Sequence, residues 1–146
     1  QAGSVQQIGK PQQVYDDPKN LFVAKFLGTP PINVFDGEVK AGKLYIGKDC
    51  VLDVHGVADQ AVTVGVRPEG FIPDPAGALC CALQNVEVMG RDVSIVSTHP
   101  ASQNVTIRSI ILSDTPVDRN AAEVRFRLKP HKVLLFRVDN GLRIPF

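Results

Sequence analysis

The residues that could bind a phosphate lie in Gly42–Asp49, where two glycines at P-loop spacing precede Lys48 and Asp49. The spacing matches a P-loop up to its last position, where Ser or Thr is needed to bind Mg²⁺ beside the phosphates. Asp49 would instead bring a negative charge close to those phosphates. In addition, Leu44–Ile46 has the composition of a strand inside the supposed loop. We therefore predict no nucleotide site here.

The other reactive side chains are few and scattered. The cysteines are odd in number and two are adjacent, which predicts free thiols in a reducing compartment rather than a disulfide framework. They are Cys50, Cys80 and Cys81. None of the histidines has a second ligand at metal-binding spacing. They are His55, His99 and His131. We predict no catalytic residue, no cofactor-binding residue and no metal ligand in this chain.

Arg67 and Glu69 are the candidate site residues, and they flank Pro68 directly after a predicted strand. The first interpretation, which we favour, is a structural ion pair or a lock on the turn. The second is a contact between two lobes or two subunits. We retain both residues as possible lobe or subunit contacts.

Composition describes an ordinary globular domain. The 146 residues are 44% hydrophobic and 21% charged, with a formal net charge of +1, so nothing indicates nucleic acid or an anionic membrane as a partner. We find no signal peptide and no apolar run near the roughly 20 residues that a membrane helix needs. The chain begins in mid-pattern at Gln1 without a Met, which we interpret as a piece of a longer protein.

Two short helices are expected near the beginning. Pro11 suits a first helical position, so one helix is predicted from there to about Tyr15. A second is predicted after Pro18, with one apolar stripe and with Lys25 on the opposite side. The stripe consists of Phe22, Val23, Phe26 and Leu27. Gly28 and the following Thr-Pro-Pro end this helix.

The remainder reads as β-structure. Strands are predicted at 33–39, 43–46, 51–54, 61–66, 79–89, 93–98, 105–112, 123–128 and 133–138. We interpret Asp36-Gly37 as a glycine bulge within a long strand and Asn140-Gly141 as a type I′ turn. The Pro-rich segment 73–77 is a candidate boundary between two lobes. Many short strands favour a mainly β fold, namely a small antiparallel barrel with a second β lobe, preceded by two short α-helices.

Three blocks carry a family resemblance. Residues 6–28, QQIGKPQQVYDDPKNLFVAKFLG, closely resemble a stretch of the ATP-binding subunits of ABC transporters of the maltose and multiple-sugar import type. Gly65–Glu69 is similar to a Gly-Val-Arg-Pro-Glu segment of their C-terminal regulatory domain, and Val133–Phe146 is similar to its last strand pair. Lys10 departs from the Ser or Thr that usually caps the first helix in the family, which costs about 1 kcal/mol of helix stability.

The resemblance implies a specific organisation. Residues 1–31 would be the helical end of the ATPase domain, and residues 32–146 would be the regulatory domain, with a barrel of the oligonucleotide/oligosaccharide-binding (OB, or TOBE) type. It implies a cytoplasmic position at the inner face of the membrane and no ATPase activity in the chain itself. ATP and Mg²⁺ would bind elsewhere in the parent protein.

The partners that the resemblance implies are a second copy of the subunit, the membrane subunits of the transporter, and a regulatory protein. Sugar uptake follows from the same likeness, with glycerol phosphate or a polyamine as other substrates. Two alternative functions stay open. One is a barrel that senses a small oxyanion. The other is an OB barrel that binds nucleic acid, which would want exposed aromatic residues among basic ones.

Overall fold

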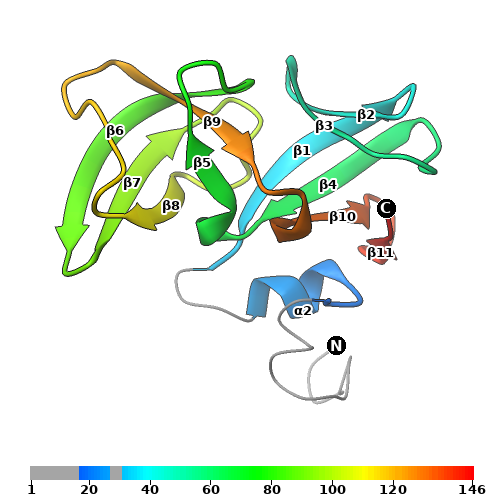
Figure 1. The fold of residues 1–146 in the computed structure, drawn as a ribbon. Helices are drawn as coiled ribbons and strands as arrows, with labels where there is room; N and C mark the ends of the chain where they lie inside the picture. The colour runs from blue at the N-terminus through cyan, green and yellow to red at the C-terminus, as the bar shows by residue number, and fades with distance from the viewer. Residues whose placement is uncertain (1–16, 27–30) are drawn as a thin grey trace.

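The computed structural model describes residues 17–26 and 31–146, and most of this chain is β-structure. One α-helix lies among the described residues, α2 (Leu21–Phe26). Two antiparallel sheets stand side by side, with α2 below the first of them (Figure 1). The predicted helix at Pro11–Tyr15 and the predicted helix end at Leu27–Gly28 lie outside the described residues.

The first sheet has six strands in the order β11-β10-β4-β1-β2-β3. They are β1 (Asn33–Lys40), β2 (Lys43–Ile46), β3 (Asp49–Asp53), β4 (Gln60–Val66), β10 (Val133–Arg137) and β11 (Arg143–Ile144). Strand β10 pairs with β4 and β11 pairs with β10, so the C-terminal strands join a sheet whose other strands come from residues 33–66.

The second sheet has five strands in the order β5-β9-β6-β7-β8. They are β5 (Phe71–Pro73), β6 (Leu79–Met89), β7 (Asp92–Thr98), β8 (Ile107–Leu112) and β9 (Glu123–Leu128). Its end strands β5 and β8 contact each other without pairing, so the sheet forms a nearly closed barrel. Two 3₁₀ turns, η1 (Pro68–Gly70) and η2 (Pro130–Lys132), connect the two sheets.

Both sheets bury their side chains in one hydrophobic cluster. Phe35 and Ile46 of the first sheet belong to it together with Ile95 and Phe126 of the second. The Phe71 and Phe126 rings meet edge to face at 5.1 Å, a favourable aromatic geometry. Burial of alternate strand residues against this shared core is what holds the two sheets together.

The buried side-chain amide of Asn33 forms hydrogen bonds that connect the two sheets. The Asn33 Nδ2 group donates to the carbonyls of Val66 (3.2 Å) and Arg108 (3.0 Å), and Asn33 Oδ1 accepts the Arg108 N–H (2.9 Å). Asn33 is 3% exposed. Each hydrogen-bonding group of this side chain is used, as the burial of an amide requires.

Three local predictions are wrong. The pairing of β1 with β4 is continuous from Asn33 to Val39, so there is no bulge at Gly37; the register shifts instead in the β2–β3 pairing between Leu44 and Tyr45 and in the β6–β7 pairing between Leu83 and Asn85. Gly37 is needed because a Cβ would lie 2.5 Å from Val64 Cγ2. The turn at Asn140-Gly141 is not type I′, because that turn needs a positive φ at both of its central residues, and of these two only Gly141 (φ 71°) has one.

The third error concerns the strand predicted from residue 105, which begins at Ile107 because residues 101–104 bond to β1 instead. The Asp36 N–H donates to the Ala101 carbonyl (2.8 Å), and the Val34 N–H donates to Asn104 Oδ1 (2.8 Å). One strand, β5, was not predicted, because three residues that end in Pro73 give no alternation to recognise. The candidate boundary at 73–77 leads from β5 to β6, two strands of the same sheet. The limits of the domains stay a prediction.

Candidate functional site

Arg67 lies beside helix α2, which several distant segments hold in place. We call the helix and these segments the helix junction. It consists of residues 17–24, Arg67, and residues 141–143. A helix of six residues is far too short to be stable alone, so its position depends on these contacts. Asn20 caps it, because Asn20 Oδ1 accepts the Val23 N–H at 2.9 Å.

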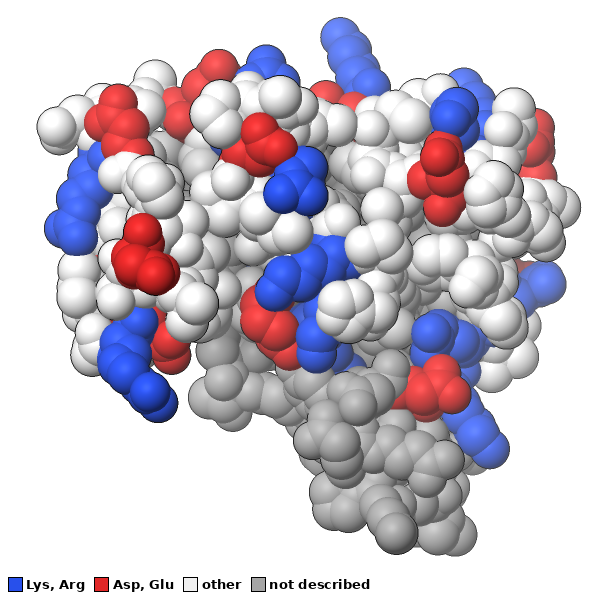
Figure 2. Space-filling model, viewed as in Figure 1, with Lys and Arg blue, Asp and Glu red and all other residues white. Residues whose placement is uncertain are grey.

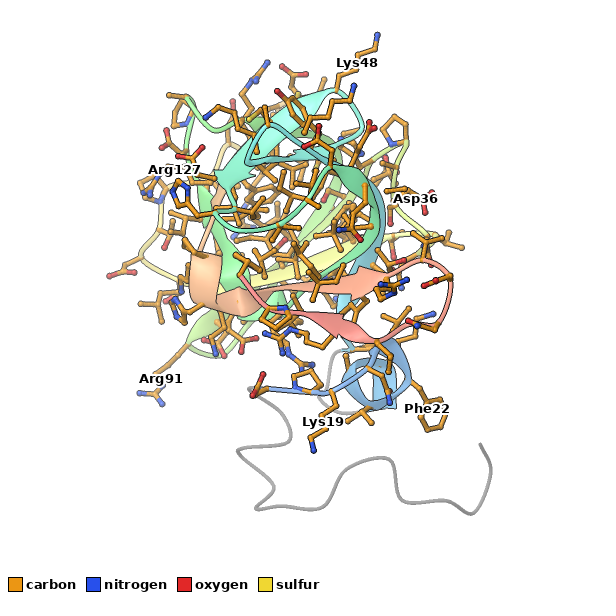
Figure 3. The ribbon with its side chains drawn as sticks, turned by 90° about the vertical axis from the view of Figure 1, so that its right-hand side faces the viewer. Lys19, Phe22, Asp36, Lys48, Arg91 and Arg127 are labelled. Carbon is orange, nitrogen blue, oxygen red and sulfur yellow. The ribbon has the colours of Figure 1, made fainter. Side chains whose placement is uncertain are left out.

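The buried side of α2 lies on the first sheet. Ala24 and Leu21 pack with Ile32, Leu134 and Phe136 in a second, smaller hydrophobic cluster. Figure 3 shows Phe22 pointing away from the sheets, and half of its surface is exposed.

Phe22 is therefore not part of a buried stripe as predicted, because Leu21 and Ala24 are the helix residues that pack on the first sheet; Val23 is buried, as predicted. Lys25 is exposed, as predicted. The side chains of Phe26 and Leu27, the rest of the predicted stripe, lie outside the described residues.

Residues 141–143 bond to residues 17–21, the segment that leads into α2 and its first residue. The Leu21 N–H donates to the Gly141 carbonyl (2.8 Å), and the Arg143 N–H donates to the Lys19 carbonyl (2.8 Å). The Arg143 guanidinium donates through Nη1 to Asp17 Oδ1 (2.7 Å) and to the Pro18 carbonyl (3.1 Å). Residues more than a hundred positions apart thus fix the path of the chain before the helix.

Arg67 holds the other end of α2. Its side chain is 2% exposed, and Nη1 donates to the Ala24 carbonyl in the last turn of the helix at 3.3 Å. A cation at this position also compensates the partial negative charge of helix carbonyls. The backbone of Arg67 is used as well, since its N–H donates to the Lys132 carbonyl (3.1 Å) and its carbonyl accepts the Gly70 N–H (2.8 Å).

Glu69 has a different neighbour. Its carboxylate pairs with Lys132 Nζ at 3.2 Å, which joins η1 to η2. Both side chains are partly exposed, so this pair adds little stability. The structure therefore places Arg67 under the helix and Glu69 beside η2. Whether either residue contacts a second subunit stays a prediction.

The segment with P-loop spacing is a β-hairpin. Leu44–Ile46 lies in β2, as predicted, and Gly47 (φ 60°) lies in the turn to β3. Asp49 Oδ2 accepts the Cys80 N–H (3.1 Å) and lies 3.2 Å from His99 Nε2. Since His99 Nδ1 accepts the Ala101 N–H, Nε2 carries the proton that is donated to Asp49. This cluster ties β3 to the barrel.

The three cysteines are free. Burial raises the pKa of Cys81 to about 12, and the hydrogen bond from Cys80 Sγ to Glu123 raises the pKa of Cys80. Neither thiol is activated as a nucleophile. Among residues 17–26 and 31–146, no group of three or more His, Cys, Asp or Glu side chains is arranged to hold a metal ion.

Charges on the surface are mixed. Figure 2 shows lysines and arginines distributed among acidic side chains over both sheets, with no single basic area on that face. Within the described part of the chain, no helix is both long and apolar enough to cross a membrane.

Comparison with known proteins identifies the relatives. The chain is 33% identical over 147 residues to the sn-glycerol-3-phosphate import ATP-binding protein of Jannaschia sp. (strain CCS1), an alignment that covers 98% of this chain and 40% of the relative. It is 32% identical over 151 residues to the maltose/maltodextrin import ATP-binding protein of Yersinia pestis bv. Antiqua (strain Antiqua), with 94% of this chain and 40% of the relative covered. The chain matches the C-terminal part of import ATP-binding proteins.

The family resemblance inferred from the sequence is thereby confirmed. A further relative is the diacetylchitobiose uptake system ATP-binding protein of Streptomyces coelicolor, 29% identical over 165 residues, with 97% of this chain and 44% of the relative covered. The chain thus spans about 40% of the length of the curated relatives it matches. No family model matches it.

The sequence analysis identified Arg67 as a candidate site residue, but it did not identify Arg143 or Asn20, which contact the same helix. Arg143 lies in the resembling C-terminal block, yet its partners Asp17 and Pro18 lie at the other end of the sequence. No spacing in a single sequence encodes such a contact.

Proposed function

We propose that this chain is the non-catalytic C-terminal domain of an importer ATPase subunit, that it pairs with a second copy of itself, and that it receives regulatory signals. The observation that carries the proposal is the match along 94–98% of the chain to the C-terminal part of the two importer proteins named above for glycerol phosphate and maltose. Sugar or a related solute such as glycerol phosphate is the proposed cargo.

The helix junction supports a role in transmission between domains. In the proposed parent, the ATPase domain precedes α2, and the bonds from Arg67, Gly141 and Arg143 hold α2 against the first sheet. Movement of the ATPase domain would then carry the barrel with it as one body. The barrel is proposed to be of the OB type, on the strength of the same resemblance.

The remaining roles follow from the parent. ATP and Mg²⁺ are proposed to bind the preceding ATPase domain, and the membrane subunits are proposed to contact that domain as well. A regulatory protein would bind the present chain. The proposed location is the cytoplasmic face of the membrane, within the transporter complex.

Pairing and catalysis can be tested separately. Two copies of the chain with different affinity tags are co-expressed and purified through one tag, and we expect the second tag to be retained. Phosphate release from Mg-ATP is measured on the same sample, and we expect none above a buffer control. Loss of the second tag contradicts pairing, whereas ATP hydrolysis that persists through repeated purification contradicts the non-catalytic assignment.

A further inference from the structure

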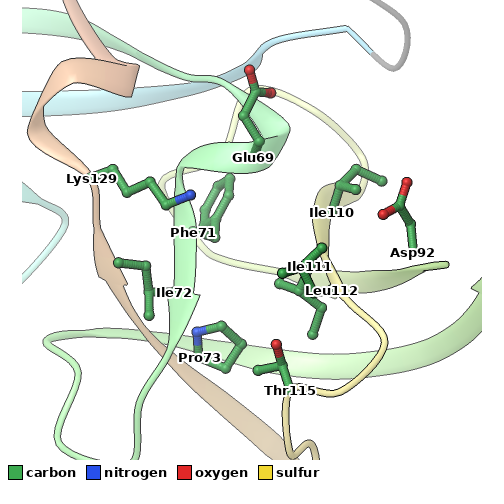
Figure 4. Close-up of a pocket in the computed structure, with 10 residues that line it drawn as sticks. All are labelled: Glu69, Phe71, Ile72, Pro73, Asp92, Ile110, Ile111, Leu112, Thr115 and Lys129. Carbon is green, nitrogen blue, oxygen red and sulfur yellow. The ribbon is translucent and has the colours of Figure 1, made fainter.

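The barrel is open along one side, between its end strands β5 and β8. A cavity of about 470 Å³ lies there. Its walls are largely apolar (Figure 4): Phe71, Ile72 and Pro73 line one side, and Ile110 and Leu112 line the other. We call this cavity the seam. Its volume falls within the range of small-molecule sites, which are often found at openings of β-barrels.

Backbone polar groups face the seam. Antiparallel strands direct the N–H and C=O of alternate residues to the same side. The N–H and C=O of Arg108 in β8 bond to the Asn33 side chain, so they point away from β7. Ile110 lies two residues further along β8, so its N–H and C=O also point away from β7, toward the seam. Beside β5, the Gly70 carbonyl accepts the Lys129 N–H and the Asp74 N–H donates to the Arg125 carbonyl, both on the side of β9. The N–H and C=O of Phe71 therefore point to the other side, toward the seam. The opening therefore offers hydrogen bonds as well as apolar walls.

One cation lies at the edge of the seam. Lys129 is half-buried, and Figure 4 shows its ammonium beside Phe71. No ion pair of Lys129 is found among the described residues. Glu69 is paired with Lys132, and its carboxylate points away from Phe71. The charged residues that line the cavity are thus Lys129, Glu69 and Asp92, and Asp92 is exposed at the opposite edge beside Ile110.

The width of the opening decides between two kinds of ligand. An added peptide strand between β5 and β8 would hold these strands about 9.5 Å apart, twice the usual strand spacing. Cα atoms of β5 and β8 already approach within 8 Å. A complete strand therefore does not fit, but a compact molecule does.

We propose that the seam binds a small amphipathic organic anion, whose apolar body lies between Ile72 and Leu112 and whose carboxylate or phosphate pairs with Lys129. The apolar body covers side chains that are now open to water; Leu112 alone is 64% exposed. The anionic group supplies the partner that the Lys129 ammonium lacks. This inference does not depend on the transport role proposed above.

Three probes of equal shape and different charge test the proposal on the 146-residue chain. They are 3-phenylpropionate, 3-phenylpropanol and 3-phenylpropylammonium, each titrated into ¹⁵N-labelled protein while amide chemical shifts are followed. We expect saturable shifts at Ile110, Leu112 and Phe71. We expect 3-phenylpropionate to bind about three- to fivefold more tightly than the alcohol, as one partly exposed charge pair allows, and the ammonium probe to bind most weakly.

Two variants separate charge from apolar contact. Lys129→Gln should make 3-phenylpropionate and 3-phenylpropanol bind equally, and the matched exposed variant Lys40→Gln should change nothing. Leu112→Asn should weaken all three probes while the spectrum stays that of the folded protein. Shifts outside the seam, equal affinities for the three probes in the original chain, or a preference for the anion that survives Lys129→Gln would each overturn the proposal.

Discussion

At the scale of single residues, the junction depends on a buried arginine. Arg67 is held by hydrogen bonds from its side chain and its backbone, to α2 and to η2. The sequence indicated this residue through its position beside Pro68, and the interpretation as a lock on the turn agrees with its backbone bonds. The bond to Ala24 could not be predicted, because a single sequence does not show which carbonyl a buried guanidinium reaches.

Replacing Arg67 should cost far more than replacing its neighbour. Arg67→Ala leaves the Ala24 carbonyl without its donor and opens a void, so we expect a loss of about 2–3 kcal/mol in the free energy of unfolding. Glu69→Gln removes a partly exposed ion pair and should cost less than about 1 kcal/mol. Urea unfolding followed by circular dichroism measures both. Equal losses would mean that Arg67 does not hold the helix.

The three thiols should react in the order of their environments. At pH 8 a raised pKa leaves less of the reactive thiolate, which slows Cys80 and, with a pKa of about 12, Cys81. Cys50 is exposed, so it should account for the fast phase with Ellman's reagent. Cys50→Ser should remove that phase. A fast phase that remains in Cys50→Ser would contradict the slow reaction expected of Cys80 and Cys81.

At the scale of elements, strands with clear alternation were predicted well and their connections were not. The strands at Lys43–Ile46, Leu79–Met89 and Glu123–Leu128 have the predicted limits. The errors at Gly37 and Asn140 share a cause, because in both places a distant segment decides the local geometry. Val64 crowds Gly37, and α2 binds the segment around Gly141. Turn rules describe a chain with no such neighbours.

The contribution of the Arg143 side chain to the stability of α2 can be tested by hydrogen exchange. Arg143→Ala removes the bonds to Asp17 and Pro18 and keeps the strand pairing of β11, so residues 17–26 should open more often. We expect the amides of Leu21 and Ala24 to exchange about tenfold faster, which corresponds to about 1.4 kcal/mol. The matched variant Arg91→Ala, on the exposed β6–β7 connection shown in Figure 3, should leave these rates unchanged. Unchanged exchange in Arg143→Ala would show that the apolar face of α2 suffices.

At the scale of the whole molecule, the described residues form two sheets around a shared core, with the short helix α2 packed on the first sheet through a second, smaller cluster. The sequence predicted a mainly β chain with a barrel, and this is what the structure has. It could not predict that β10 and β11 join the first sheet, because that pairing brings together segments about seventy residues apart, as in Val133 with Val66. For the same reason it did not reveal the seam, whose walls come from β5 and β8.

The central claim is that this chain is a pairing domain, and the solution mass of the chain tests it most directly. Light scattering is measured from micromolar to millimolar protein concentration. The account predicts a mass that rises from one chain to two chains and then stays constant, as expected for a closed two-fold dimer. A mass of one chain at every concentration would contradict the claim for this chain and would assign pairing to other parts of the parent protein.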